Sequence, residues 1–335
     1  MEEKSLIKAI AQAINSLRNI DESSKSIIAD AILSSNEKIN LLITGSTGCG
    51  KSSTINALFG SNVASIGTGT DPETMDIKKY VLKNNIVLWD SPGLGDSPEK
   101  DKRHAAGIRK KLAELDENKD PLIDLVLVIL DGSTRDYGTS YTLINDVIIP
   151  SLGDEAKERI IVAINRSDVA MNGFNIWDKE NNKPTPKLEA FLEQKVESVK
   201  SRIKESTGVN VDPIYYSAGY KDEDYQQAPW NLTKLLLFIV ENTKLEKRMI
   251  YSYNISTDAN AWKDSDQKSN YKEEIEILFK KSFIDRIKQA LKKAGEGAAV
   301  GAAAGTVVPG VGTEIGTVVG AVAGAITGFF DLNWW

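Results

Sequence analysis

The chain has 335 residues, of which 41% are hydrophobic and 26% are charged, and its formal net charge is -6. This length indicates one substantial domain with additions, and the negative charge argues against broad electrostatic binding of nucleic acid. With one cysteine and one histidine, the chain excludes an internal disulfide framework and a multi-histidine zinc site, and we expect a protein of the reducing cytosol without a signal peptide.

Two short amphipathic segments open the chain, at residues 5–18 and 24–34. Their apolar side chains recur at helical spacing, which predicts an N-terminal helical extension over residues 1–36. From residue 39 onward, apolar runs alternate with helical patterns. This alternation predicts an α/β domain whose mostly parallel sheet is covered on both faces.

One pair of predicted strands differs from the rest. Residues 75–82 and 85–90 are joined by so short a turn that the two strands must be antiparallel. The predicted sheet is therefore mixed. The domain that contains it is expected to end near residue 245.

A glycine-rich loop follows the first predicted strand. Residues 45–52 read GSTGCGKS, which fits G-x-x-x-x-G-K-[S/T] between a strand and a helix. Lys51 is expected to reach the β- and γ-phosphates of a nucleotide, and Ser52 to ligate Mg2+. The predicted nucleotide-binding residues of this loop are Gly45, Ser46, Thr47, Gly48, Cys49, Gly50, Lys51, Ser52 and Ser53.

A second loop follows the strand at residues 85–90, where DSPG begins at Asp90. In many P-loop proteins an Asp-x-x-Gly sequence in this position holds Mg2+ and senses the γ-phosphate. We expect Asp90 to act at the metal and the Gly93 amide to act at the γ-phosphate. Leu94 stands where Ras-like GTPases have the glutamine that orients the attacking water, so another group must supply that part of catalysis.

Two further motifs predict the base. The strand at residues 159–165 ends in NRSD, where Asp168 can accept two hydrogen bonds from guanine that adenine does not offer. Asn165 is expected to tie the loops together, and the stem of Arg166 to cover a face of the base. The next apolar run ends at Ser217 and Ala218, and the Ala218 amide is expected to meet the guanine O6.

In this order, residues 45–52, 90–93, 165–168 and 217–218 resemble the G1, G3, G4 and G5 elements of translation-factor-related GTPases. The sequences GKSSTINALFG and DSPGLGD resemble Era-like bacterial GTPases of the 50S ribosome-binding type, and they are also similar to septins and to the chloroplast Toc/AIG1 group. The resemblance covers residues 38–245. It implies a P-loop GTPase domain that binds GTP and GDP with Mg2+ and hydrolyses GTP.

The resemblance also implies residues outside the motifs. Thr74 is the favoured switch I threonine and metal ligand, because its P-x-T setting leads into a strand as in Era-like and septin-like proteins. Thr70 has the Ras-like spacing from Lys51 and stays open. Together with Ser52 and Asp90, Thr74 completes the predicted metal ligands.

The Toc/AIG1 likeness suggests Arg135 as a catalytic group that faces a second G domain across the nucleotide. The alternative for Arg135 is a surface arginine paired with Asp131 or Asp136. Arg103 and His104 either approach the γ-phosphate or lie solvated on the helix after switch II. The predicted catalytic residues are thus Lys51, Thr74, Gly93 and Arg135.

Beyond residue 245 the pattern changes. Residues 253–271 have no sustained period and predict a linker or loop, and an amphipathic helix with a basic second half follows, which would favour anionic lipid. Glycines then recur every four residues in an apolar stretch, a pattern that lets helices pack closely, especially in lipid. We expect a division into residues 1–36, the helical extension; 37–245, the G domain; 246–296, the linker and basic helix; and 297–335, a glycine-zipper tail.

These features predict a GTPase switch that is stimulated when two G domains form a homodimer. We expect it to be cytoplasmic and held through its tail at the inner face of a membrane. A soluble glycine zipper is the alternative for the tail. A ribosome-associated assembly GTPase and a pore-forming or toxic effector gated by a G domain are the alternatives for function, although the acidic chain shows no KH or S4-like RNA-binding pattern.

Overall fold

The computed structural model describes residues 37–60, 77–82, 85–95, 97–173, 175–221 and 226–294, together with Gln12, Asn15, Ser16, Glu22, Gly320 and Gly324. Apart from those isolated positions, the expected N-terminal extension and the glycine-zipper tail lie outside the described residues. Both switch I candidates, Thr70 and Thr74, also lie outside them.

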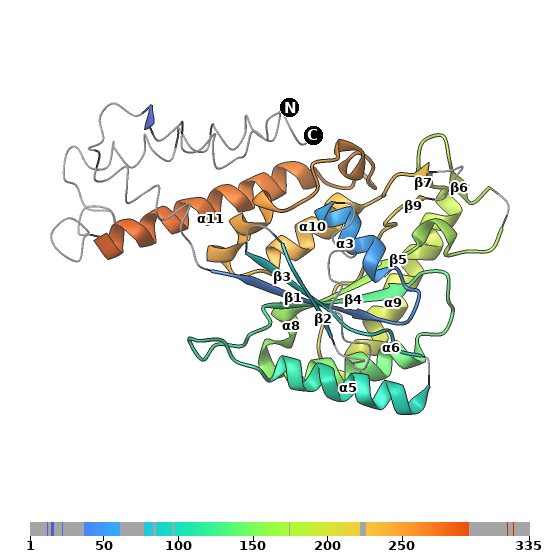
Figure 1. The fold of residues 1–335 in the computed structure, drawn as a ribbon. Coiled ribbons are helices and arrows are strands. Elements are labelled where there is room, and N and C mark those ends of the chain that lie inside the picture. Colours follow the sequence, from blue (N-terminus) through green and yellow to red (C-terminus); the bar gives the residue numbers. More distant parts are fainter. Residues whose placement is uncertain are drawn as a thin grey trace.

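Six strands form one sheet, in the order β2-β3-β1-β4-β5-β8 (Figure 1). The strands are β1 (Ile39–Gly45), β2 (Lys78–Val81), β3 (Ile86–Asp90), β4 (Leu125–Asp131), β5 (Ile160–Asn165) and β8 (Ile214–Tyr215). β2 runs antiparallel to β3, and the other neighbours are parallel, so the mixed sheet is confirmed. Because the carboxyl ends of the parallel strands meet at one edge, the loops that follow them gather there.

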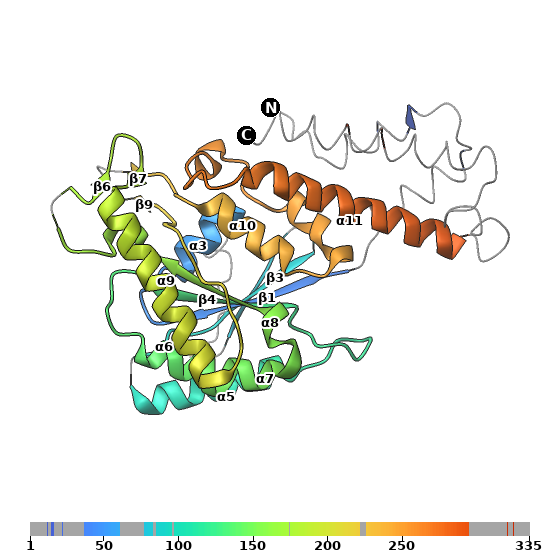
Figure 2. The ribbon, with the colours of Figure 1, turned by 180° about the vertical axis from the view of Figure 1, so that it is seen from behind.

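Helices cover both faces of the sheet (Figures 1 and 2). One face carries α3 (Lys51–Phe59), α10 (Leu232–Glu241) and α11 (Tyr271–Ala294), and the other carries α5 (Pro98–Leu112), α6 (Gly138–Leu143), α7 (Ile149–Leu152) and α9 (Pro186–Thr207). Side chains alternate along β4, so that Leu127 belongs to the first apolar cluster and its neighbour Val128 to the second. This two-sided burial explains why the strand reads as a continuous apolar run.

Shorter elements connect these parts. The helix α8 (Ala156–Arg159) precedes β5, and a π-helical turn at Ile144–Ile148 joins α6 to α7. Two small hairpins, β6 (Trp177–Asp178) with β7 (Lys183–Pro184) and β9 (Tyr220–Lys221) with β10 (Gln226–Gln227), lie beside the carboxyl ends of β5 and β8. The 3-10 turns are Gly153–Glu155, Ser167–Val169, Leu245–Tyr253 and Ala259–Trp262.

The segment after residue 245 packs closely on the G domain. The expected loop at residues 253–271 holds only the end of one 3-10 turn and a second short turn before α11 begins, yet it is not an unpacked linker. Trp262 is 1% exposed, and its indole nitrogen donates to the carbonyl oxygen of Ser256. The apolar residues of this segment stand singly between polar turns, without the spacing of a helix or a strand. The sequence pattern therefore does not predict that the segment packs on the domain. The division of the chain near residue 245 stays a prediction.

The amphipathic helix α11 is confirmed over residues 271–294. Its apolar side chains Ile275, Phe279 and Phe283 are buried in the same cluster as β1, α3 and α10. The guanidinium of Arg286 is also buried, and it donates to the carbonyl oxygen of Glu246 and pairs with Glu37. Over residues 275–283, the apolar face of α11 is therefore occupied by the protein itself.

Among the described residues, no helix combines the length and the apolar character that crossing a membrane requires.

Candidate nucleotide-binding site

The loop between β1 and α3 has the backbone of a phosphate cradle. Gly45 and Gly50 have positive φ angles of 148° and 92°, and a Cβ atom on either would lie 2.2 Å from a neighbouring atom, the Ile129 carbonyl oxygen or the Asn165 amide nitrogen. Only glycine fits these two positions. The ammonium of Lys51 lies across the loop and donates to the carbonyl oxygens of Gly45 and Ser46, at 3.3 and 3.2 Å.

Asn165, at the end of β5, joins the phosphate loop to the predicted base loop. Its side-chain amide donates to the carbonyl oxygen of Cys49 at 2.9 Å, and its side-chain oxygen accepts from the backbone N–H of Ala218 at 2.9 Å. The expected tie between the loops is confirmed. The Ala218 N–H therefore already has an acceptor, so its contact with a guanine O6 stays a prediction that requires this amide to be shared or released.

The NRSD segment turns sharply after β5. Arg166 has a positive φ of 61°, and its guanidinium pairs with Asp131 at 2.9 Å. The backbone N–H of Ser167 donates to the Tyr216 carbonyl oxygen at 3.2 Å, which sets the 3-10 turn containing Asp168 beside the end of β8. Asp168 is partly exposed there, on the same edge of the sheet as the phosphate loop.

Asp90, the last residue of β3, carries a carboxylate oxygen, Oδ1, that is buried and has no hydrogen-bond partner among the described residues. Burial raises the pKa of Asp90, while the charges of Lys51 and Lys78 act in the opposite direction. A buried carboxylate oxygen without a donor fits a nearby cation.

The described residues contain no cluster of three or more His, Cys, Asp or Glu side chains that could hold a metal by themselves. Mg2+ is commonly bound by one or two carboxylates with phosphate oxygens and water. Asp90 and the exposed hydroxyl of Ser52 at the start of α3 fit that kind of site.

Gly93 and the phosphate loop approach each other closely. A Cβ atom on Gly93 would lie 2.6 Å from both the backbone nitrogen and the Cα atom of Thr47. The Thr47 N–H donates to the Leu94 carbonyl oxygen at 3.0 Å, and the Leu94 N–H donates to the Gly45 carbonyl oxygen at 3.4 Å. The switch II loop is thus paired with the phosphate loop through the backbone of Leu94.

The side chain of Leu94 is a core residue. It is 5% exposed and belongs to the apolar cluster that includes Ile108 and Leu112 of α5. Its backbone fixes the loop and its side chain anchors α5. Neither group is a substitute for the glutamine that Ras-like proteins use.

Arg135 is exposed in the loop between β4 and α6, and it forms no ion pair within the described part of the chain. Of its two expected partners, Asp131 pairs with Arg166, and Asp136 accepts from the backbone N–H of Gly138 at 2.8 Å. Arg135 is thus at the surface, as the alternative expects, but its pairing with Asp131 or Asp136 is not present among the described residues, and its catalytic role stays a prediction.

His104 lies on the buried face of α5, about one helical turn before Ile108 and two turns before Leu112. It is 5% exposed, and neither ring nitrogen has a hydrogen-bond partner among the described residues. The expectation of a solvated histidine is wrong. The spacing of residues 104, 108 and 112 was the signal for this burial.

Two contacts of the site have no sequence signal. The hydroxyl groups of Thr54 in α3 and Tyr216 after β8 lie 2.7 Å apart and are buried. Lys195 of α9 donates to carbonyl oxygens of the loop that carries Arg135. These partners are distant along the chain, and neither belongs to a motif.

Comparison with known proteins agrees with this geometry. Residues 40–166 match the model of the 50S ribosome-binding GTPase family. The uncharacterized protein YkfA of Escherichia coli K12 is 30% identical over 130 residues, which are 38% of this chain and 41% of YkfA. Interferon-gamma-inducible GTPase 10 of Mus musculus is 38% identical over 103 residues, or 28% of this chain and 25% of that protein.

A solved structure, the LeoA bacterial dynamin GTPase from ETEC, aligns over 87% of this chain and 45% of LeoA, with 12% identity and a TM-score of 0.41. The chain spans less than half the length of the curated relatives it matches. The family match covers the phosphate loop, the Asp90 loop and the strand that ends at Asn165. Over residues 40–166 the chain is therefore similar to the 50S ribosome-binding GTPase family.

Proposed function

We propose that this protein binds GTP with Mg2+ and hydrolyses it to GDP and phosphate. The observation that carries the proposal is the position of Asn165, which links the phosphate loop at Cys49 to the base loop at Ala218. One side chain thereby sets the distance between the two halves of a nucleotide site. The family match of residues 40–166 supports guanine nucleotide as the ligand.

Each predicted residue that the structure describes then has a role that its place supports, while Thr74, outside the described residues, is assigned by its sequence position alone. Lys51 and the glycine loop bind the β- and γ-phosphates, and Asp168 accepts from the guanine N1–H and 2-amino group. Ser52 and Asp90, with Thr74, would hold Mg2+, which neutralises charge on the phosphate oxygens. The Gly93 amide faces the γ-phosphate, so loss of that phosphate releases the switch II loop.

Titration calorimetry with GTP, GDP and ATP, in the presence of Mg2+, tests this assignment. Guanine nucleotides are expected to bind, and ATP is expected to bind far more weakly, because adenine cannot donate to Asp168. Equal binding of ATP and GTP would overturn it.

We further propose that two G domains meet across the nucleotide and that Arg135 of one copy acts on the γ-phosphate of the other. The exposed, unpaired Arg135 supports this. Two exposed apolar side chains flank the base site: Val169, 47% exposed, directly follows Asp168, and Tyr220, 56% exposed, lies two residues after Ala218. Exposed arginine and aromatic residues are typical of protein interfaces.

The remaining proposal is that the protein acts at the cytoplasmic face of a membrane through residues 297–335. The glycine repeat and the four terminal aromatic residues of the sequence support it. The buried apolar side chains of α11, Ile275, Phe279 and Phe283, pack on the G domain, so we assign lipid contact to the tail. Flotation with anionic liposomes is expected for the full chain and not for a chain that ends at residue 296. Equal flotation of both would contradict the proposal.

A further inference from the structure

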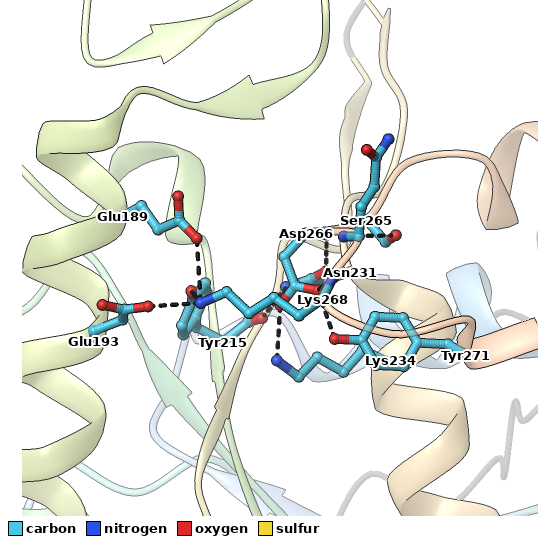
Figure 3. A network of polar contacts seen from close by, with 10 residues as sticks. Glu189, Glu193, Tyr215, Asn231, Lys234, Ser265, Asp266, Lys268 and Tyr271 are labelled. Atoms are coloured by element: carbon cyan, nitrogen blue, oxygen red, sulfur yellow. Dashed lines mark hydrogen bonds and ion pairs between the residues drawn. The ribbon is translucent and has the colours of Figure 1, made fainter. Parts of the chain in front are cut away.

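A buried polar network joins the segment before α11 to the G domain (Figure 3). Its centre is Asp266, whose side chain is 1% exposed. The Asp266 carboxylate pairs with Lys234 of α10 at 2.8 Å and accepts from the hydroxyl of Tyr271 at 2.5 Å. Tyr271 is the first residue of α11, so Asp266 connects α10 with the start of the C-terminal helix.

Asn231 extends this network to the sheet. It is fully buried and has a positive φ of 57°. Its side-chain oxygen accepts from the Asp266 N–H at 2.7 Å, its side-chain amide donates to the Tyr215 carbonyl oxygen at 3.1 Å, and its backbone N–H donates to the Asp264 carbonyl oxygen at 2.9 Å. Asn231 thus connects β8, through its side-chain amide, with the segment at 264–266, through its side-chain oxygen and its backbone N–H.

The neighbouring residue, Trp230, continues the connection to the base loop. Its backbone N–H and carbonyl both pair with Ser217, at 2.9 Å each, and its ring stacks on Tyr215 at 5.8 Å between centroids. Trp230 also forms a parallel bridge with Asp264. Ser217 directly precedes Ala218, so a chain of backbone and side-chain contacts runs from Asp266 to the predicted guanine loop.

Lys268 fastens the same segment to α9. Its ammonium donates to Glu193 at 2.6 Å and pairs with Glu189 at 3.2 Å (Figure 3). The segment at 264–268 is therefore held from α9, α10 and α11 at once. Movement of that segment requires breaking the part-buried contacts of Asp266 together, whereas the ion pairs of Lys268 are solvent-exposed and add less.

We propose that Asp266 and Asn231 are positioning residues for guanine binding: they hold Ser217 and Ala218 in place and so set how long the nucleotide stays bound. This inference rests on the proposed GTP-binding function. It makes the segment at 264–268 part of the nucleotide site, although no nucleotide motif includes it. It also places α11, which leads toward the glycine-zipper tail, in direct contact with the residue that controls the base loop.

The chain offers a matched control at the opposite edge of the sheet. Asp124 precedes β4, pairs with Lys247 of the C-terminal segment at 2.6 Å, and accepts from the Asn40 N–H at 2.8 Å. The side chains of Asp124 and Asp266 are 4% and 1% exposed, and both partner lysines are 17% exposed. The two ion pairs have similar burial and both attach the C-terminal segment, but only Asp266 is connected to the base loop.

The test compares Asp266→Asn with Asp124→Asn in the full chain, by the dissociation rate of a fluorescent GDP analogue. Dissociation is expected to be roughly tenfold faster in Asp266→Asn, the factor for the loss of about one net hydrogen bond to a charged group. The dissociation rate is expected to change less than about twofold in Asp124→Asn. This limit separates an effect on the base loop from a general loss of stability. Steady-state kinetics should show a higher KM for GTP in Asp266→Asn with an unchanged kcat.

Equal acceleration in both variants, or none in Asp266→Asn, would overturn the inference. If Asp266→Asn does not fold, Lys234→Gln and Asn231→Ser interrupt the same network and are expected to accelerate release in the same direction; unchanged release in both would overturn it too. Failure of the wild-type chain to bind guanine nucleotide contradicts the proposed function instead, so the two failures are distinguishable.

Discussion

Lys195 of α9 donates a hydrogen bond of 2.7 Å to the carbonyl oxygen of Thr134, the residue directly before Arg135. The same ammonium donates to the carbonyl oxygen of Gly132 and lies over the rings of Tyr137 and Phe191, at 5.2 and 5.6 Å from their centroids. These contacts hold the loop backbone while the Arg135 side chain stays exposed. The backbone of an arginine on a fixed loop loses little freedom when the side chain meets a phosphate, which favours a role in phosphoryl transfer.

Replacing Arg135 by alanine is expected to lower the GTP hydrolysis rate by about 10^3-fold at protein concentrations where the wild type dimerises, because a supplied arginine contributes at least this factor in related chemistry. GDP affinity should stay unchanged, since Arg135 forms no hydrogen bond or ion pair with a residue of the base loop or the phosphate loop in the described part of the chain. Single-turnover hydrolysis and GDP titration measure the two effects. The control is Arg103→Ala, which changes an exposed arginine of α5. A loss of rate in that variant and not in Arg135→Ala would show that Arg135 is not the catalytic arginine.

Replacing Asp168 by asparagine is expected to change the preferred base. The amide can no longer accept two hydrogen bonds from guanine, but it can donate to the 2-carbonyl group of xanthine. The loss for GTP should be about tenfold or more, the cost of leaving buried donors of the base unpaired. Competition binding with GTP and xanthosine triphosphate measures the change, and retention of GTP preference would remove Asp168 from the base site.

Replacing Gly93 by alanine is expected to push the switch II loop away from the phosphate loop, because the new Cβ atom would lie 2.6 Å from the backbone of Thr47. Affinity for a non-hydrolysable GTP analogue should fall by about tenfold or more, a shift of about 1.4 kcal/mol. Gly107→Ala in α5 is the matched control, since a Cβ atom there meets nothing within 4 Å. That variant should bind as the wild type does and gain up to about 1 kcal/mol in stability, as a helix gains when alanine replaces glycine. Equal binding by the two alanine variants would show that the close approach is unimportant.

The contribution of Asp266 to stability should depend on pH. Burial raises the pKa of Asp266, but hydrogen bonds from Lys234 and Tyr271 outweigh burial, and the pKa lies below its ordinary value. A lowered pKa in the folded state means that the ionised carboxylate stabilises the fold above the ordinary aspartate pKa of about 3.9. This contribution is lost as the pH falls through the folded-state pKa.

The melting temperature of Asp266→Asn should therefore lie well below that of the wild type at pH 7, and the difference should shrink below about pH 4. Thermal denaturation followed by circular dichroism at several pH values measures the difference. A difference that stays constant from neutral to acidic pH would show that the charge of Asp266 is not what stabilises the network.

Much of the fold follows from local patterns. The apolar run of β4 predicts a strand covered on both faces, and the short turn between β2 and β3 predicts their antiparallel pairing. The phosphate loop can also be predicted from the sequence, because its backbone requires glycine at positions 45 and 50 for steric reasons. In the strands the constraint acts between residues that are close along the chain; at Gly45 and Gly50 it comes from the distant Ile129 and Asn165, and only the motif makes it predictable.

The remaining features depend on contacts between distant residues. Leu94 can be placed after Asp-x-x-Gly by likeness, but only the packing against α5 shows that its side chain is a core residue. Lys195 and Asp266 are single polar residues without a periodic or motif context, and their partners lie on other elements. Their roles come from the topology, which brings those elements to one edge of the sheet.

The central claim is a GTPase whose missing catalytic group comes from a second copy of the chain. The most direct test is GTP turnover per molecule measured against protein concentration, with and without anionic liposomes. Turnover per molecule is expected to rise as the concentration passes through the dimerisation range, and to rise at lower concentration on liposomes. Arg135→Ala is expected to remove the rise. Turnover per molecule that stays flat across this range in the wild type would contradict it.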